Sequence, residues 1–241
     1  MDAVGTERRG RDSRKAARVA TKIEMLPTLK RKLPVTEPMN EEQVLRIHNA
    51  SMAILEEVGV TFRDKIALEQ WRQAGADVQG ERVRFSRDLI MELLSSIPET
   101  ITLHARDPKK TVHLGGDHSI FVPMTGAPFV CDLDNKRRWP TPEDLNNLHK
   151  LAHMCPAIHS SAHHIVEPMD RAVSHRHLYI TYSSMKHSDK TFMGMTTSGK
   201  NAEDVMNMCK ILFGAHYLED HPVVTGNVNG NSPLVWDETM L

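Results

Sequence analysis

The chain has 241 residues, of which 40% are hydrophobic and 25% charged, and its formal net charge is -1 at pH 7. This length is enough for one large or two small globular domains, and the balanced charge excludes a surface that is basic overall and binds polyanions. Neither a run of roughly 18 apolar residues nor the apolar stretch of a secretory signal is present, so we expect a cytoplasmic protein without membrane or nucleic-acid partners.

The three cysteines, Cys131, Cys155 and Cys209, are odd in number and far apart in the sequence. No Cys-x-x-Cys pair occurs, which argues against both a disulfide framework and a zinc knuckle. We expect reduced thiols, most of them buried.

Residues 1–37 are predicted to form a basic, disordered tail. Arginine and lysine are frequent between Met1 and Lys32, and large apolar residues are scarce. This composition is typical of a solvated segment. A nucleic-acid-binding or organelle-targeting arm is the alternative, but the rest of the chain carries no basic face to match it.

Residues 38–125 are predicted to form a small α+β module that begins with a helix. Asn40 is a candidate N-cap with Gln43 as its capping-box partner, and Gly59 is a natural C-terminal stop. Apolar residues recur between them at helical spacing. The residues expected to face the core are Val44, Ile47, Ile54, Leu55 and Val58.

The rest of this module is predicted to contain two more helices and a hairpin. A helix over residues 66–74 is followed by a short strand at Val83, and Ser86 then caps a helix with Ile90, Leu93 and Leu94 facing inward. Alternating apolar residues over 101–105 and 112–114 predict a β-hairpin.

Residues 126–241 alternate between predicted strands and helices. Helices are expected to begin near residues 141, 171 and 202, and strands to lie at 157–162, 191–195 and 222–226. This spacing of about thirty residues is the length of one βα unit and indicates a parallel sheet. A doubly wound sheet is disfavoured because no Gly-x-Gly-x-x-Gly turn follows the first strand. The pattern therefore predicts an α/β fold of the (β/α)8 barrel type, of which about three units lie in this chain, so that we expect the barrel to be incomplete here.

Several short motifs, in consistent order and spacing over residues 38–241, resemble the N-terminal part of the trimethylamine methyltransferase family. They are Arg46–Val60, Ala74–Val78, Thr102–Pro108, Gly115-Gly116-Asp117, Gly126-Ala127-Pro128 with Asp132-Leu133, and the helix that starts at Thr141.

The resemblance implies a corrinoid-dependent methyltransferase on a (β/α)8 barrel. Such an enzyme moves a methyl group from a methylated or quaternary amine, of the trimethylamine or glycine betaine type, to the cobalt of a separate corrinoid protein. The implied cobalamin is carried by that partner and not bound directly. Some members carry pyrrolysine in a later segment, which this chain does not reach. By homology the remainder would hold much of the active site, so we expect an inactive N-terminal fragment and assign no catalytic residue. The resemblance leaves the amine and homo-oligomerisation open.

Polar residues that follow the predicted strands are the candidate substrate-binding groups, because barrel enzymes place functional groups at the C-terminal ends of their strands. For each residue the competing interpretation is an ordinary turn or helix cap. Trp236 is included because a quaternary ammonium has no N–H to donate and is bound by aromatic faces and carboxylates. The candidates are His163, His164, Thr196, Thr197, Asn227, Asn229 and Trp236.

The fourteen histidines raise the question of a metal site. His175 and His177 lie two apart on a predicted helix and point in different directions, and no His-Glu-x-x-His motif occurs. We therefore predict no protein-bound metal. A metal-dependent barrel hydrolase and a non-catalytic amine-binding protein are the alternative functions.

Overall fold

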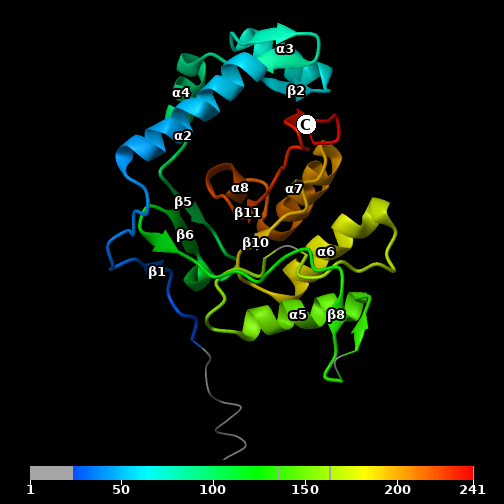
Figure 1. Cartoon of the computed structure of the whole chain (residues 1–241). Helices are drawn as coiled ribbons and strands as arrows, with labels where there is room; N and C mark the ends of the chain where they lie inside the picture. Colours follow the sequence, from blue (N-terminus) through cyan, green and yellow to red (C-terminus); the bar gives the residue numbers. More distant parts are fainter. Residues whose placement is uncertain (1–23, 135, 163, 241) are drawn as a thin grey trace, which may run out of the picture.

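The structure, a computed structural model, describes residues 24–134, 136–162 and 164–240. Its helices lie in two groups with one helix between them (Figure 1). At one end lie α2 (Glu41–Ala53), α3 (Lys65–Gln73) and α4 (Arg87–Ser95), toward the other α5 (Pro142–Met154) and α6 (Val173–His187), and between these groups α7 (Gly199–Phe213). No helix in the described part of the chain has the length and apolar character needed to cross a membrane.

Helix α2 begins at the predicted capping box. The side chain of Asn40 accepts a hydrogen bond from the Gln43 N–H (2.9 Å), and the Gln43 side chain accepts one from the Asn40 N–H (3.0 Å), which satisfies two otherwise unpaired donors. The helix continues as a π-helical turn, η1 (Ile54–Val58), and stops at Gly59. A Cβ at Gly59 would lie 2.3 Å from the Val83 carbonyl oxygen, so only glycine allows this close approach.

The predicted inward face of α2 is wrong. Val44, Ile47, Ile54 and Val58 are all between 46% and 56% exposed, and Leu55 packs only partly against the core. The predicted inward positions of Leu93 and Leu94 on α4 are wrong as well, because both are exposed. Helical spacing identified the apolar faces, but the described chain supplies no layer that covers them.

The core of the first region lies between α3 and a four-stranded sheet of order β12-β2-β4-β3. Phe62, Val83, Phe85 and Leu68 are buried there. The strands are β2 (Val60–Phe62), β3 (Asp77–Gln79), β4 (Arg82–Arg84) and β12 (Val235–Trp236).

Strand β12 belongs to the second half of the sequence but pairs in parallel with β2, and the end of the described chain therefore lies beside the first region (Figure 1). The Trp236 ring stacks on Phe62 with centroids 6.2 Å apart. The division at residues 125 and 126 thus does not separate the two regions in space.

A second sheet has the order β1-β7-β6-β5. Strands β5 (Thr100–Leu103) and β6 (Val112–Gly115) form the predicted hairpin, joined through the 3₁₀ turn η2 (Pro108–Lys110). Strand β1 (Leu29–Lys30) pairs with β7 (His118–Ser119).

For residues 26–31 the prediction of a solvated tail is wrong, because backbone hydrogen bonds attach this segment to the body of the protein. Residues 1–23 of that predicted tail lie outside the described residues.

The second region has the predicted alternation of helices and parallel strands. Helices α5, α6 and α7 begin close to the expected positions. Strand β10 (Phe192–Met193) pairs in parallel with β11 (Val224–Thr225), and an isolated parallel bridge joins Ser160 to Thr191 where the first strand was expected. The described residues form a mixed α/β arrangement in which no barrel is closed. The sequence did not predict the hairpin β8 (Val130–Cys131) and β9 (Arg137–Arg138) or the short helix α8 (Tyr217–Asp220).

A buried lysine fixes the junction between α5 and the following strand. Lys190 donates from Nζ to the carbonyl oxygens of Ala152 (2.7 Å), Cys155 (2.8 Å) and Ile158 (2.6 Å). These carbonyls lie at and beyond the end of α5, where helix carbonyls have no intrahelical partner. Burial lowers the pKa of Lys190 to about 8.

The three cysteines are free, and they differ in exposure. Cys131 is exposed, Cys155 is half-buried and Cys209 is buried in the α7 core, where desolvation raises the pKa of its thiol to about 11. The prediction that most are buried therefore holds fully only for Cys209.

Candidate functional site

The candidate site lies where three neighbouring parallel segments end. The segment at Ser160–Ala162 is bridged to Thr191, and β10 is paired with β11, so these three ends lie at one edge of the structure. Ala162 is buried and has a φ of 59°, a left-handed conformation that non-glycine residues rarely adopt. Strained backbone of this kind is often found at functional sites.

Thr196 and Asn227 lie together at this edge. The Thr196 hydroxyl approaches the Asn227 carbonyl oxygen at 3.5 Å. A Cβ at Gly226 would lie 2.7 Å from Thr196 Oγ1, so the threonine packs directly on the glycine backbone. The structure thus brings together two residues that the sequence placed after different strands. Asn229 is exposed in the loop that continues from Asn227.

Thr197 has a partner within its own helix start. Its Oγ1 accepts a hydrogen bond from Asn201 Nδ2 (2.8 Å), while the Ser198 side chain accepts one from the Asn201 N–H and caps α7. This is the helix-cap role weighed against substrate binding, and the substrate-binding role of Thr197 stays a prediction.

His164 forms the third part of the edge. Its Nε2 lies 3.6 Å from Glu167 Oε2, and the other Glu167 oxygen accepts a hydrogen bond from Arg176 Nη1 (2.8 Å). Burial lowers the pKa of His164, and the Glu167 carboxylate opposes that shift. His163, the other member of the predicted pair, lies outside the described residues.

The loop at Gly126 closes over His164. The Gly126 N–H donates to the His164 carbonyl oxygen (2.8 Å), and a Cβ at residue 126 would come within 3.4 Å of His164 Nε2. Sequence reasoning missed Glu167 and Arg176. A carboxylate three residues after a candidate histidine was the available signal for Glu167, whereas Arg176 lies on α6 and only folding brings it near.

Trp236 lies beside the core of the first region. Its ring belongs to the core beside Phe62, and the loop from Asn227 runs back over it, since a Cβ at Gly230 would lie 2.9 Å from Trp236 Nε1. The segment that carries Trp236 pairs in parallel with β2. An aromatic face supplied by Trp236 to the substrate stays a prediction.

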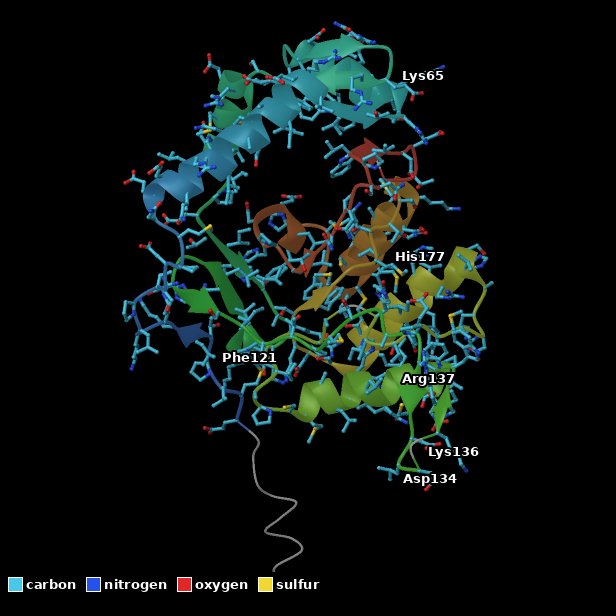
Figure 2. All side chains as sticks on the ribbon, in the orientation of Figure 1. Lys65, Phe121, Asp134, Lys136, Arg137 and His177 are labelled. Atoms are coloured by element: carbon cyan, nitrogen blue, oxygen red, sulfur yellow. The ribbon has the colours of Figure 1, made fainter. Side chains whose placement is uncertain are left out.

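The remaining histidines near this region connect helices. His177 is buried on α6 (Figure 2) and its Nε2 lies 2.8 Å from Asp204 Oδ2 on α7, while His175 is exposed, so the two point apart as predicted. Among residues 24–134, 136–162 and 164–240, no three His, Cys, Asp or Glu side chains are placed to hold a metal ion. The edge thus presents a hydroxyl, amides, an imidazole and a carboxylate held by Arg176, groups that can orient a small polar molecule.

Comparison with known proteins identifies a family and several relatives that are named as methyltransferases. The sequence profile of the family described as trimethylamine methyltransferase (MTTB) matches residues 7–241. A glycine betaine methyltransferase of Desulfitobacterium hafniense (strain Y51) is 41% identical over 210 residues, which are 87% of this chain and 44% of that protein.

Two relatives with lower identity are also named as methyltransferases. The trimethylamine methyltransferase MttB of Desulfitobacterium hafniense (strain DSM 10664 / DCB-2) is 26% identical over 205 residues, 81% of this chain and 40% of the relative. An L-carnitine:corrinoid methyltransferase of Eubacterium limosum is 30% identical over 112 residues, 46% of this chain and 23% of the relative. The chain thus spans less than half the length of these curated relatives.

Proposed function

The chain belongs to the trimethylamine methyltransferase family, and from that premise we propose that it serves methyl transfer from a quaternary amine of the glycine betaine type to a corrinoid protein. The observation that carries the choice of amine is the 41% identity to a protein named for glycine betaine, against 26% to one named for trimethylamine. The corrinoid protein is the proposed partner and carries the cobalamin.

A reduced corrinoid would supply the cobalt nucleophile that bonds to the methyl carbon, while the C–N bond breaks and the amine nitrogen keeps the electron pair. The chain would bind the amine and orient one methyl group along the line of attack. Orientation of this kind lowers the barrel enzyme's activation barrier without a catalytic acid or base.

We assign the polar groups at the strand-end edge to the two ends of such a substrate. The Thr196 hydroxyl and the side chains of Asn227 and Asn229 can donate hydrogen bonds to a carboxylate. The quaternary end has no N–H to donate and would be attracted by a carboxylate such as Glu167, which Arg176 holds in place. His164, next to Glu167, would contact the same end of the substrate.

The proposed scaffold is a (β/α)8 barrel, and the parallel β10–β11 pair with its alternating helices supports it.

Because the described residues do not close a barrel, we further propose that the 241 residues alone are catalytically inactive. The test is methylation of a reduced corrinoid protein, followed by the absorbance change of the cobalt centre. We expect no turnover by this chain alone. A version extended to the length of the relatives should turn over with glycine betaine in preference to trimethylamine. Preference for trimethylamine would overturn the choice of glycine betaine as substrate. Turnover by the 241 residues would contradict the proposal that they are inactive alone.

A further inference from the structure

An apolar groove of about 480 Å³ lies between the last turns of α6 and α7. Two methionines contribute to it, and methionine side chains adapt to different partners. Ile211 is 87% exposed. The groove is lined by Tyr182, Met185, Lys186, Met208, Ile211, Leu212 and Arg106.

The two charged residues that line the groove are both cations. Arg106 donates from Nη1 and Nη2 to the carbonyl oxygens of Met185 (3.0 Å) and Ser188 (3.1 Å), and Lys186 Nζ lies 5.3 Å from the Tyr182 ring centroid. Within the described residues, neither cation forms an ion pair with a carboxylate. The groove therefore combines an apolar floor with a positive rim.

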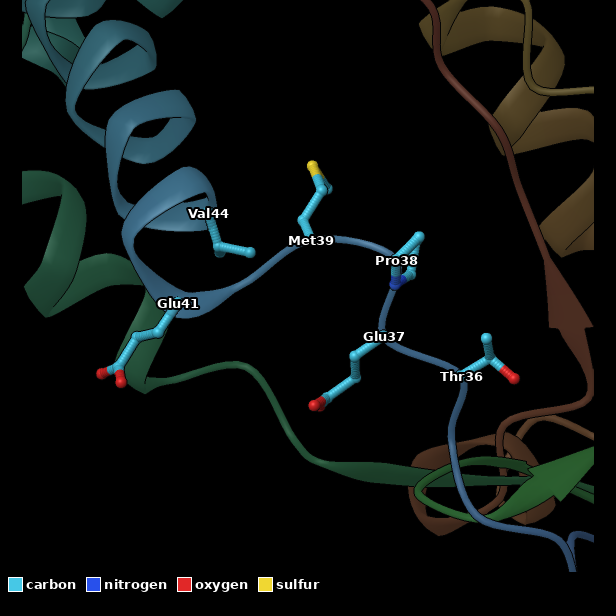
Figure 3. A pocket seen from close by; sticks show the side chains of 6 residues that line it. All are labelled: Thr36, Glu37, Pro38, Met39, Glu41 and Val44. Carbon is cyan, nitrogen blue, oxygen red and sulfur yellow. The ribbon is translucent and has the colours of Figure 1, made fainter.

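The start of helix α2 is apolar like the groove, but its charged residues Glu41 and Glu42 are negative. Every residue from 41 to 47 is exposed, including Val44, Leu45 and Ile47. Figure 3 shows Met39, Val44 and Glu41 around an open pocket of about 520 Å³ where the chain enters the helix. Glu41 and Glu42 make no ion pair with the described basic side chains. Helices without tertiary packing are marginally stable in water, so a partner surface would stabilise the first two turns of α2.

We propose that the first two turns of α2 dock into the α6–α7 groove of a second copy of this chain. Val44 and Leu45 would pack on Met208 and Ile211, and Glu41 would face Lys186. This is recognition of an amphipathic helix by an apolar groove, with charges of opposite sign at the rim.

One copy cannot insert its own α2 into its own α6–α7 groove, so the two surfaces that meet must belong to different copies. Figure 1 shows α2 and α6 on different sides of the molecule. If each of two copies inserts its α2 into the groove of the other, the pair forms a closed dimer. If each copy instead binds a further copy, the contacts form a ring or a filament.

The test is sedimentation equilibrium of the 241-residue chain, with circular dichroism to verify folding. Wild type should self-associate at micromolar concentration. Lys186→Glu and Glu41→Lys should each raise the dissociation constant at least about tenfold, and the double variant, in which the charges are exchanged, should recover most of that loss. Ile211→Asp, at an exposed position, should abolish association without unfolding the chain.

Lys136→Glu is the matched control, since it makes the same charge change at the β8–β9 hairpin, away from both surfaces (Figure 2). It should leave association unchanged. A wild-type chain that stays monomeric at about 100 μM would overturn the proposal. So would a double variant that associates no better than the two single variants.

Discussion

The His159 ring donates a hydrogen bond from Nε2 to the Pro27 carbonyl oxygen over 3.0 Å. Its Nδ1 accepts one from the Phe121 N–H, also at 3.0 Å, and the side chain is completely buried. One ring nitrogen must carry the proton and the other must not, so His159 is held as the neutral Nε2–H tautomer. A single ring therefore connects the N-terminal segment, the loop at Phe121 and the first segment of the second region.

Replacing His159 by phenylalanine should destabilise the protein. The change leaves the Phe121 N–H and the Pro27 carbonyl without their partner, and the loss of two hydrogen bonds costs about 1–3 kcal/mol in total. Urea unfolding measures the change. His175→Phe, at an exposed position on α6, is the control and should stay within roughly 0.5 kcal/mol of wild type. Equal stability of the two variants would contradict the structural role of His159.

Truncation should separate two parts of the N-terminal segment. Removing residues 1–23, which the sequence predicts to be solvated, should change the melting temperature little. Removing residues 1–31 also deletes β1 and the Pro27 carbonyl that pairs with His159, so it should lower the melting temperature clearly. Scanning calorimetry of both forms provides the comparison. Identical melting temperatures would show that β1 contributes nothing.

Lys190→Met should cost about 2–4 kcal/mol, because three carbonyl oxygens lose one shared donor. The pH dependence gives a second measurement. The pKa of Lys190 is about 8 in the folded protein, below the usual value near 10.4, so the unfolded chain binds more protons between these values. The contribution of Lys190 to stability therefore rises with pH across that window. We expect the slope of unfolding free energy against pH to be smaller in the variant, and an unchanged slope would refute this.

Asp144→Asn should weaken the start of α5. Asp144 accepts hydrogen bonds from both Nη atoms of Arg138 (2.7 and 2.8 Å) and from the Thr141 N–H, and these bonds hold the pKa of its carboxyl well below the usual range. Its stabilisation is thus present above pH ~4 and is lost as the pH falls further. We expect a loss of about 1 kcal/mol at pH 7 that shrinks in acid. Chemical denaturation at several pH values tests this, with the exposed Asp134→Asn as control.

At the candidate site, the histidines that follow Ala162 are the first to mutate. In an active, full-length enzyme, replacing by alanine the one that faces the pocket should lower methyl transfer at least tenfold, about 1.4 kcal/mol of transition-state stabilisation, with the fold retained. Replacing the other should mainly reduce stability. His163→Ala and His164→Ala are measured in parallel. Normal kinetics in both would count against the whole edge as the binding site.

Local signals in the sequence predicted much of the fold. The capping box at Asn40 and the helix start at Thr141 depend on residues at most three apart, and the structure has both, together with the β5–β6 hairpin. Such signals depend on the backbone and on neighbouring side chains alone, so they can be read without knowing the fold.

Features that need distant partners were harder to predict. Helical spacing marked Leu93 and Leu94 as one apolar face, but whether anything covers that face depends on the rest of the structure. At the candidate site, Thr196 and Asn227 follow from strand order, whereas Glu167 and Arg176 meet only after α6 packs. The pairing of the Trp236 strand with β2 was not predicted, because no local signal in the sequence indicates it.

The return of β12 to β2 also bears on how the protein is made. Strands β2 and β12, which lie far apart in the sequence, must meet before the first sheet is complete, and the Phe62–Trp236 stack forms only then. During synthesis the first region therefore emerges without its fourth strand, with the edge of β2 open and the Phe62 ring uncovered on the side that Trp236 will occupy. Contacts between residues so far apart in sequence form slowly, and an exposed strand edge invites wrong pairing in the meantime. The newborn chain is therefore most exposed to wrong strand pairing while the second region is still being translated.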